Sequence, residues 1–359
     1  MSGSELLLFA FCAMHLLVTA IFTWLIMRWR SNNARNSPTI SIIIAARNEA
    51  KNLGRLIPKL QAQDYPNFEI VIGLDRCEDE SAALLKSFKN PQLKFIDIEH
   101  VAEGWNGKKY ALDQAILNAS GEWLVFTDAD CAPNSNRWLT SLSKEITSST
   151  NVLIGISPYL ANRSFLSKYI QHEAFMTYFL YLGFALIGRP YMAVGRNMAV
   201  KKRFFEEMGG YKKIKGVLGG DDDLFIQQAP KKDIKVCMGP DSLIFTEPAE
   251  SLAAYKNQKF RHFSVAKHYS KTDLLLLSVF HGIHLTFYFL LIFHLKNTWI
   301  LPVVLFYLSF QLTSYRFVSH KIGTRLNYLL FPFVDLLYAL ATPLLSIWSR
   351  FVNNIEWKS

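Results

Sequence analysis

Trp123-Leu-Val-Phe-Thr-Asp-Ala-Asp130 is the stretch from which the fold of this chain can be predicted. Its apolar start, followed by turn residues from Cys131 onward, is typical of a short buried strand. An extended backbone points alternate side chains to one side, so Asp128 and Asp130 would face the same way. Two like charges favour a cation between them, and oxygen ligands suit Mg²⁺ or Mn²⁺. We expect a metal site here, although an isolated Asp-x-Asp is more often a solvated turn.

The chain before residue 250 alternates predicted strands with predicted helices. Further strands are predicted at 40–45, 68–74 and 93–98, and helices at 52–63, 81–88 and 110–119. Such alternation indicates βαβ units and a mainly parallel sheet, so we predict an α/β fold. Ligands of these sheets bind at the carboxyl ends of the strands. The groups that follow strand ends should therefore meet at one edge: Asp75, Asp128 and the Arg47-Asn-Glu49 loop.

Composition indicates a membrane protein that carries a soluble domain. Half of the 359 residues are hydrophobic and only 19% are charged. The net charge of +10 comes without a dense Lys/Arg block, which disfavours nucleic acid and favours an anionic membrane surface and phosphorylated substrates. The four cysteines show no CxxC spacing, which argues against a disulfide framework or a zinc site.

The first hydrophobic segment predicts the topology. Residues 4–27 are long enough to span a bilayer, and basic residues follow but do not precede them: Arg28, Arg30 and Arg35. The positive-inside rule places the N-terminus outside and the next domain in the cytoplasm, and the charge pattern favours an uncleaved anchor over a signal peptide. Further spans are predicted at 273–295, 298–315 and 326–348. The expected domains of this multi-pass protein of a bacterial-type cell membrane are 1–30, 38–270 and 271–350.

Two helical segments carry polar residues that need an explanation. Residues 164–188 are rich in Phe and Tyr but hold charged groups near their start, which favours a membrane-surface helix over a span or a buried helix. In the predicted span at 273–295, His281 and His284 lie three residues apart on one helical face. We expect packing or lipid head-group contacts from them rather than a metal pair.

Loops at the predicted strand ends offer nucleotide and phosphate contacts. The stretch Ala45-Ala-Arg47-Asn-Glu49 could hold a base or ribose, or Asn48 could cap the next helix. Asp75 could accept a hydrogen bond from a base N–H group. Lys108 or Lys109 could meet a phosphate at a helix N-terminus, and the absence of Walker spacing excludes an NTPase P-loop.

Two further clusters follow in the second half of this region. Asn197, in the turn at 195–199, could hydrogen-bond a sugar or an acceptor hydroxyl, or be an ordinary polar turn residue. Gly219-Gly-Asp-Asp-Asp-Leu-Phe225 packs three carboxylates before a short helix, and an N-cap accounts for only one of them. Crowded carboxylates raise one another's pKa, which is how a general base is poised, so Asp221 and Asp222 are catalytic candidates.

The last cluster, Gln258-Lys-Phe-Arg-His262, lies just before the second predicted span. Gln258, Arg261 and His262 would fall on a single helical turn. Arg261 could bind a diphosphate with two parallel hydrogen bonds, or it could serve as a basic anchor at the membrane interface.

Taken in order, these motifs resemble those of the family 2 glycosyltransferases, membrane enzymes with a GT-A fold. The resemblance covers residues 38–270 and the spans, and it rests on the opening strand and loop at 41–49, Gly107-Lys108 with Ala111-Leu112, Asp128-Ala-Asp130, Asp221-Asp-Asp-Leu224 and Gln258…Arg261. The chain departs from the family pattern at Leu74, Asp113, Gly220 and His262. Because Gly220 replaces an acidic residue, Asp222 remains a rival to Asp221 as the base.

The resemblance implies an inverting, metal-dependent transfer of a sugar from a nucleotide diphosphate sugar to a lipid-linked or membrane-associated acceptor. Asp128 and Asp130 would hold Mg²⁺ or Mn²⁺, and Asp221 would deprotonate the acceptor hydroxyl. The donor would be bound by Ala45, Arg47, Glu49, Asp75, Lys108, Asp128, Gln258 and Arg261. The acceptor would be bound by Asn197 and His262.

Two other functions remain open. A processive polysaccharide synthase would extend a polymer, but His262 in place of the family's Trp and the few spans that follow it weaken this interpretation. A catalytically silent scaffold that binds nucleotide sugars is the other, and the intact carboxylate set argues against it. The sugar, the nucleotide and the acceptor are not specified by these residues.

Overall fold

The computed structural model describes residues 2–34 and 36–352, which fall into two compact units. The sheet unit holds the described residues of 30–160 and 188–247, and the helical unit holds 2–29, 161–187 and 248–352. Arg35, one of the arginines used to predict the topology, lies outside the described residues. Residues 161–187 and 248–270, which lie within the expected domain at 38–270, belong to the helical unit.

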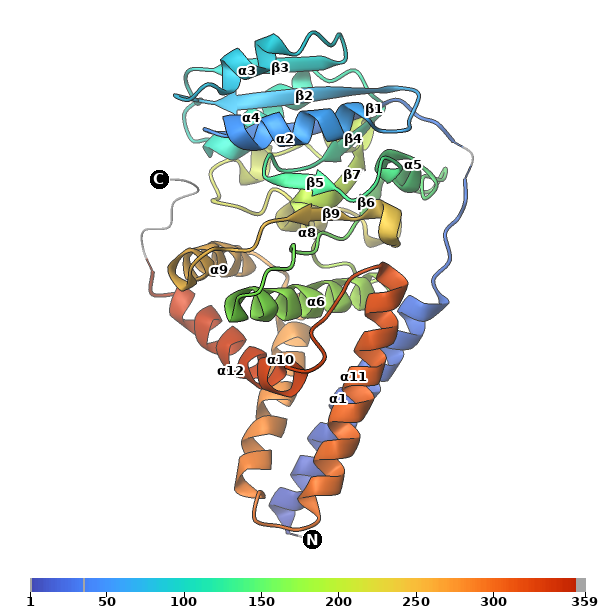
Figure 1. The fold of residues 1–359 in the computed structure, drawn as a ribbon, viewed down its shortest axis with the longest axis vertical. Helices are drawn as coiled ribbons and strands as arrows, with labels where there is room; N and C mark the ends of the chain where they lie inside the picture. The colour runs from blue at the N-terminus through green and yellow to red at the C-terminus, as the bar shows by residue number, and fades with distance from the viewer. Residues whose placement is uncertain (1, 35, 353–359) are drawn as a thin grey trace. The chain divides into compact units, whose positions relative to one another are not determined.

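A seven-stranded sheet organises the sheet unit, in the order β3-β2-β1-β4-β7-β6-β8 (Figure 1). Its first four strands in the sequence are parallel, as predicted, and they are β1 (Ile40–Ala46), β2 (Phe68–Asp75), β3 (Leu93–Ile98) and β4 (Trp123–Phe126). Parallel strands bring their carboxyl ends to one edge. The residues that follow β1, β2 and β4 therefore meet there.

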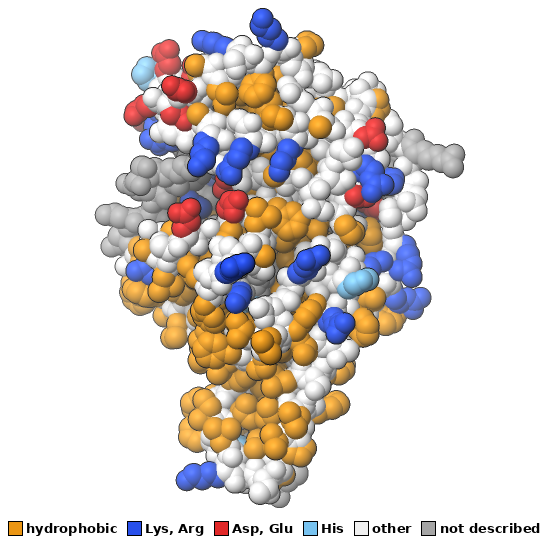
Figure 2. Space-filling model, in the orientation of Figure 1, with side chains coloured by type: hydrophobic (Ala, Val, Ile, Leu, Met, Phe, Trp, Pro, Cys, Tyr) orange, Lys and Arg blue, Asp and Glu red, His pale blue; other side chains and the backbone are white. Residues whose placement is uncertain are grey.

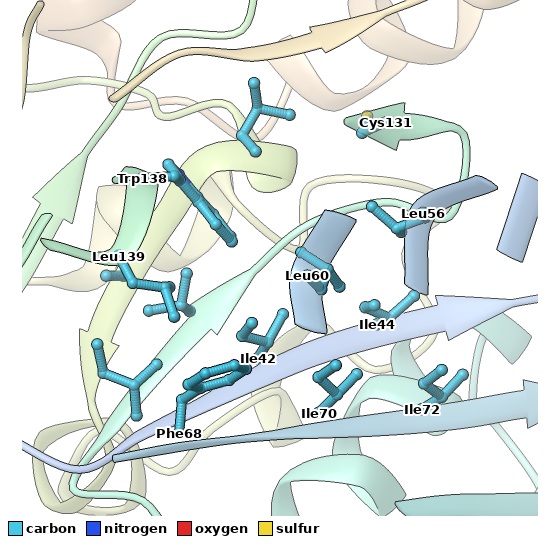
Figure 3. Packing of buried hydrophobic residues seen from close by; sticks show 14 of the residues in the cluster. Ile42, Ile44, Leu56, Leu60, Phe68, Ile70, Ile72, Cys131, Trp138 and Leu139 are labelled. Atoms are coloured by element: carbon cyan, nitrogen blue, oxygen red, sulfur yellow. The ribbon is translucent and has the colours of Figure 1, made fainter. Parts of the chain in front are cut away.

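The core on one face of this sheet comes from alternate strand residues. Ile42 and Ile44 of β1 lie beside Ile70 and Ile72 of β2 in register, and all are buried. Their side chains point to the same side, where α2 (Ala50–Gln61) packs above them (Figure 3). β1 and β2 are buried throughout, because parallel strands of this kind are covered on both faces, whereas the edge strand β3 exposes Lys94 and Asp97.

The opposite face is covered by α4 (Gly107–Leu117), which packs on β1 and β2. Gly73 of β2 permits this approach, because a Cβ atom there would lie 2.2 Å from the Ala111 carbonyl oxygen. The predicted helices at 52–63, 81–88 and 110–119 are confirmed as α2, α3 (Ser81–Ser87) and α4.

The second half of the sheet contains short strands that pair over long sequence distances. β7 (Met198–Lys201) runs antiparallel to both β4 and β6 (Val152–Ile154), and β6 is parallel to β8 (Ile234–Val236). A separate two-stranded sheet joins β5 (Cys131–Pro133) to β9 (Ile244–Thr246). Three short helices connect these strands: α5 (Trp138–Ser143), α7 (Lys202–Glu207) and α8 (Asp223–Gln228).

Among the described residues of the helical unit, four helices are long and apolar enough to cross a membrane. They are α1 (Gly3–Arg28), α10 (Lys271–Phe293), α11 (Ile300–Ile322) and α12 (Phe331–Ser349). Apolar side chains dominate the visible surface over α1, α10 and α11 (Figure 2). Leu6, Leu17, Leu275, Leu305 and Phe306 are among the exposed ones, as lipid contact would require.

Two other helices of this unit are less apolar. α6 (Phe165–Leu186) corresponds to the predicted stretch 164–188, and within the unit it is largely buried, packing on α1 and α12. Gly183 receives the ring of Phe22 from α1, because a Cβ atom at this position would lie 2.2 Å from that ring. α9 (Leu252–Ala266) packs on α12 and begins at the N-cap Ser251.

A buried acidic residue joins three helices of the helical unit. Asp335 of α12 accepts hydrogen bonds from His172 of α6 at 3.2 Å, and from His284 and Tyr288 of α10 at 3.0 and 2.7 Å. All four side chains are buried. His284 is thus a partner of a carboxylate, while the ring of His281 packs edge-on against Tyr338.

We predict that replacing Asp335 with Leu destabilises the helical unit by about 2–5 kcal/mol, because His172, His284 and Tyr288 would each lose a buried acceptor. The midpoint of thermal unfolding in detergent measures this. As a control, Asp241→Leu breaks only an exposed ion pair with Arg137 and should shift the midpoint little. Equal shifts in the two variants would contradict the prediction.

Candidate active site

The two predicted metal ligands lie directly after β4. Asp128 is half-buried, Asp130 is exposed, and together with Cys131 they offer ligand atoms that all lie within 4.8 Å of one another. Desolvation and the neighbouring Asp128 carboxylate raise the pKa of Asp130. Burial raises the pKa of the Cys131 thiol well above its ordinary value, so this thiol stays protonated. The two carboxylates are therefore the available hard ligands, and this donor set fits Mg²⁺ or Mn²⁺.

Lys108, in the first turn of α4, bridges two acidic residues that are far apart in the sequence. Its Nζ lies 3.0 Å from Asp128 Oδ1 and 3.1 Å from Asp221 Oδ2. Burial opposes the charge of Lys108, but Asp128, Asp221 and Asp222 outweigh it and raise the lysine pKa. The ammonium group therefore stays charged and joins the candidate metal site to the candidate base.

Asp221 is buried and Asp222 is half-buried, and the two residues differ in their partners. Burial disfavours ionisation of Asp221, but Lys108 and Lys109 offset this and lower its pKa. Asp222 Oδ2 accepts a hydrogen bond from Gly195 N–H at 2.6 Å, and its Oδ1 accepts one from Asp223 N–H at 2.7 Å. Burial and the adjacent Asp221 raise the pKa of Asp222 to about 6. Asp222 thus holds the start of α8 in place, while Asp221 faces Lys108.

The ends of β1 and β2 contribute a second group of predicted residues. Asp75 is fully buried, and its carboxylate accepts hydrogen bonds from the Arg76 guanidinium at 2.7 and 3.2 Å. Gly107 lies against it, because a Cβ atom at residue 107 would come within 2.2 Å of Asp75 Oδ2. The strand ends and the start of α4 thus meet at this edge of the sheet, as predicted from the order of the strands.

The loop after β1 is held by its own neighbours. Glu49 is buried, and its backbone N–H donates to Ser81 Oγ at 3.2 Å. Asn48 has a left-handed φ of +54° and accepts a hydrogen bond from Glu78 N–H at 2.8 Å. Arg47 is half-buried in this loop, whereas Ala45 lies inside β1, paired with Gly73.

Asn197 is fully buried beneath the site, and its amide serves the fold. Its Oδ1 accepts a hydrogen bond from Trp138 Nε1 at 3.1 Å, and its Nδ2 donates to the carbonyls of Ile156 and Ser242 at 2.7 and 2.8 Å. The hydrogen bonds of the Asn197 side chain are therefore made within the fold, and they leave both amide hydrogens in use.

The adjacent Arg196 is a site residue that the sequence analysis did not single out. Its Nε donates to Ser157 Oγ at 2.6 Å, and its guanidinium lies over the Tyr159 ring at 5.2 Å from the centroid. The charge of Arg196 acts on Asp130 and lowers its pKa in opposition to Asp128. The sequence offered one indication of Arg196: it lies next to Asn197 in the turn at 195–199, which was already considered as a possible part of the site.

Gln258, Arg261 and His262 lie within one turn of α9, in the helical unit. Glu173 of α6 fixes this helix, because its carboxylate pairs with Lys259 Nζ at 2.8 Å and accepts a hydrogen bond from Tyr255 at 2.8 Å. The predicted helical spacing of these three residues is therefore present.

Comparisons with known proteins bear on this arrangement. Residues 41–209 match the family model described as Glycosyl transferase family 2. Over 164 residues the chain is 29% identical to 4,4'-diaponeurosporenoate glycosyltransferase from Staphylococcus aureus strain MRSA252, and 28% identical to that from strain USA300. The match covers 45% of this chain and 39% of each relative, so well under two thirds of the relatives' length is spanned.

A solved structure covers the chain more completely. It is the mannosyltransferase PcManGT from Pyrobaculum calidifontis in complex with GDP-Man and Mn²⁺, with a TM-score of 0.60 and 18% sequence identity. It covers 97% of this chain and 99% of its own chain. At this identity the likeness establishes the fold alone.

We predict that replacing Lys108 with Met raises the pKa of Asp221, because the ammonium group that favours its ionised form is lost. A ¹³C NMR titration of labelled aspartate carboxyls measures this shift, and Asp222 should titrate near pH 6 in the unaltered protein. The exposed Lys213 provides the control variant, Lys213→Met. An unchanged Asp221 titration in Lys108→Met would contradict the expected charge coupling.

Proposed function

We propose that this chain is an inverting, metal-dependent glycosyltransferase that uses a nucleotide sugar, and the match of residues 41–209 to the family 2 model and the fold shared with PcManGT support this. It transfers one sugar from a nucleotide diphosphate sugar to a lipid-linked acceptor at the cytoplasmic membrane face. The observation that carries this proposal is the double contact of Lys108 with Asp128 and Asp221, at 3.0 and 3.1 Å. This contact brings the proposed metal ligand Asp128 close to the proposed base Asp221.

Asp128 and Asp130 would hold the divalent cation. When bound, such a cation supplies positive charge that stabilises the nucleoside diphosphate leaving group. Support for this site comes from the paired carboxylates of this chain and from the protonated state of Cys131. Lys108 adds a protein cation at the same place, and Arg196 adds a second.

Asp221 accepts the proton of the acceptor hydroxyl as the oxygen attacks the anomeric carbon. The bond from that carbon to the diphosphate breaks, and the configuration at the carbon inverts. Asp221 suits this role because its lowered pKa keeps it ionised at neutral pH, whereas the oxygens of Asp222 accept backbone hydrogen bonds.

Asp75, Arg47 and Glu49 would bind the nucleoside, at the strand ends where α/β sheets bind ligands. From α9, Gln258 and Arg261 would contact the donor diphosphate, and His262 the acceptor. The four apolar helices support an acceptor with a lipid part, and the Staphylococcus aureus relatives are named for 4,4'-diaponeurosporenoate. A screen of UDP- and GDP-sugars with membrane lipid extract, followed by mass spectrometry of new lipids, would test the proposal. A polymeric product would favour a processive synthase instead.

Replacing Asp221 with Asn should lower kcat by about 10²–10⁴-fold and leave the donor KM nearly unchanged, because the base is lost while donor contacts remain. The measurement is release of nucleoside diphosphate coupled to lipid product. Asp222→Asn is the matched comparison, and we expect a smaller loss from it. The reverse order of effects would assign the base to Asp222.

Treatment with EDTA should abolish transfer, and Mn²⁺ or Mg²⁺ should restore it. In Asp130→Asn, the Mn²⁺ concentration for half-maximal activity should rise about 10-fold or more, because one charged oxygen ligand is lost. Titrating activity against Mn²⁺ measures this. Full activity in the presence of EDTA would refute the metal requirement.

A further inference from the structure

We infer that Lys109 is a positioning residue whose ammonium group fixes the backbone of the loop that presents Asp221. The role of Asp221 in this inference rests on the proposed function, but the contacts of Lys109 do not. From the sequence, either Lys108 or Lys109 was a candidate for a phosphate contact. In the structure these adjacent lysines point to different partners on the same loop.

The loop at residues 215–222, here called the aspartate loop, contains neither a helix nor a strand. Gly219 and Gly220, immediately before Asp221, both have left-handed φ angles, of +74° and +72°. Two glycines in succession leave the backbone with many accessible conformations. The position of Asp221 therefore depends on contacts that hold this loop from outside.

Lys109 supplies such contacts from the first turn of α4. Its Nζ donates hydrogen bonds to the carbonyl oxygens of Val217 and of Gly219, the latter at 2.5 Å. The Lys109 side chain is fully buried. Nearby, the backbone N–H of Asn106 donates to the Lys215 carbonyl at 2.7 Å. The segment before α4 and its first turn thus hold the aspartate loop at three carbonyl groups.

Burial of the Lys109 ammonium group costs free energy, so its presence in the core needs a physical explanation. An ammonium group loses its hydration when it is buried, and a carboxylate at ion-pair distance is the usual compensation. Among the described residues no ion pair of this kind involves Lys109, and its Nζ instead donates hydrogen bonds to two backbone carbonyls. An apolar side chain would fill such a site at lower cost, so the value of the charge lies in where it fixes the loop.

Lys108 and Lys109 therefore have different roles at the aspartate loop. Lys108 contacts the Asp221 carboxylate, and Lys109 contacts the backbone just before it. The helix that carries them is itself anchored, since α4 packs on β1 and β2. Just past its other end, Lys202 Nζ donates to the Ala119 carbonyl at 2.6 Å. The aspartate loop is thus held against an element that cannot move independently of the sheet.

The test compares Lys109→Met with Lys202→Met in the full chain. Both variants lose an ammonium-to-carbonyl contact close to α4, but only the first loses the contact with the aspartate loop. For Lys109→Met we expect kcat to fall about 100-fold with the donor KM changed less than about threefold, since a small misplacement of a catalytic group is enough for such a loss. Lys202→Met should keep both values.

Hydrogen–deuterium exchange gives a readout that needs no activity. Amide exchange in a peptide covering residues 215–222 should be about tenfold faster in Lys109→Met and unchanged in Lys202→Met. Should Lys109→Met fail to fold, Lys109→Gln serves in its place, because its amide NH₂ group can still donate hydrogen bonds while the charge is removed. Wild-type kcat, or reduced kcat with unchanged exchange in this loop, would overturn the inference. An inactive unaltered protein would refute the proposed function instead, and the exchange comparison would still decide the anchoring.

Discussion

An ammonium group placed between two carboxylates is the interaction on which the sheet unit's candidate site depends. Lys108 can reach Asp128 and Asp221 together because α4 begins at Gly107, beside the ends of the parallel strands. Without this cation, several acidic groups would share a partly dehydrated space, and some would become neutral. The charge state of the site therefore depends on the register of the sheet and on the packing of α4.

The helical unit meets a similar problem in apolar surroundings. Asp335 is buried where α6, α10 and α12 meet, and donors from two of these helices compensate its charge. Glu173 of α6 does the same for α9 through Lys259 and Tyr255. In each case a single acidic residue specifies how neighbouring helices fit together, which packing of apolar side chains alone would define less sharply.

The predictable part of the fold was the part with strong local signals. β1, β2 and β4 are mainly apolar runs and the apolar helices are long, so their sequences indicated them, although α11 continues to Ile322 beyond the predicted end at 315 and α12 begins at Phe331 rather than at 326. The three-residue strands β5, β6, β8 and β9 could not be predicted, because their pairing is decided by distant partners. The grouping of residues 161–187 with the apolar helices is likewise set by long-range packing.

In the candidate site, too, the residues with local sequence motifs could be predicted and those defined by distant partners could not. Asp128, Asp130, Lys108 and Asp221 carry local motifs, and three of these are joined by contacts in the structure. The function of Lys109 was not visible, because a lysine that binds a distant carbonyl has the same sequence signature as one that binds phosphate. Asn197 had a turn-like context, yet its amide is consumed by Trp138 and two carbonyls.

The absence of a side chain at Gly107 fixes how closely α4 approaches the end of β2. Even a methyl group there would come within 2.2 Å of Asp75 Oδ2, so Gly107 lets the helix start touch the end of β2. The close contact of Gly107 with Asp75 therefore sets the separation of Asp75 and Lys108. Any larger side chain at residue 107 would push the start of α4 away from the end of β2 and change that separation.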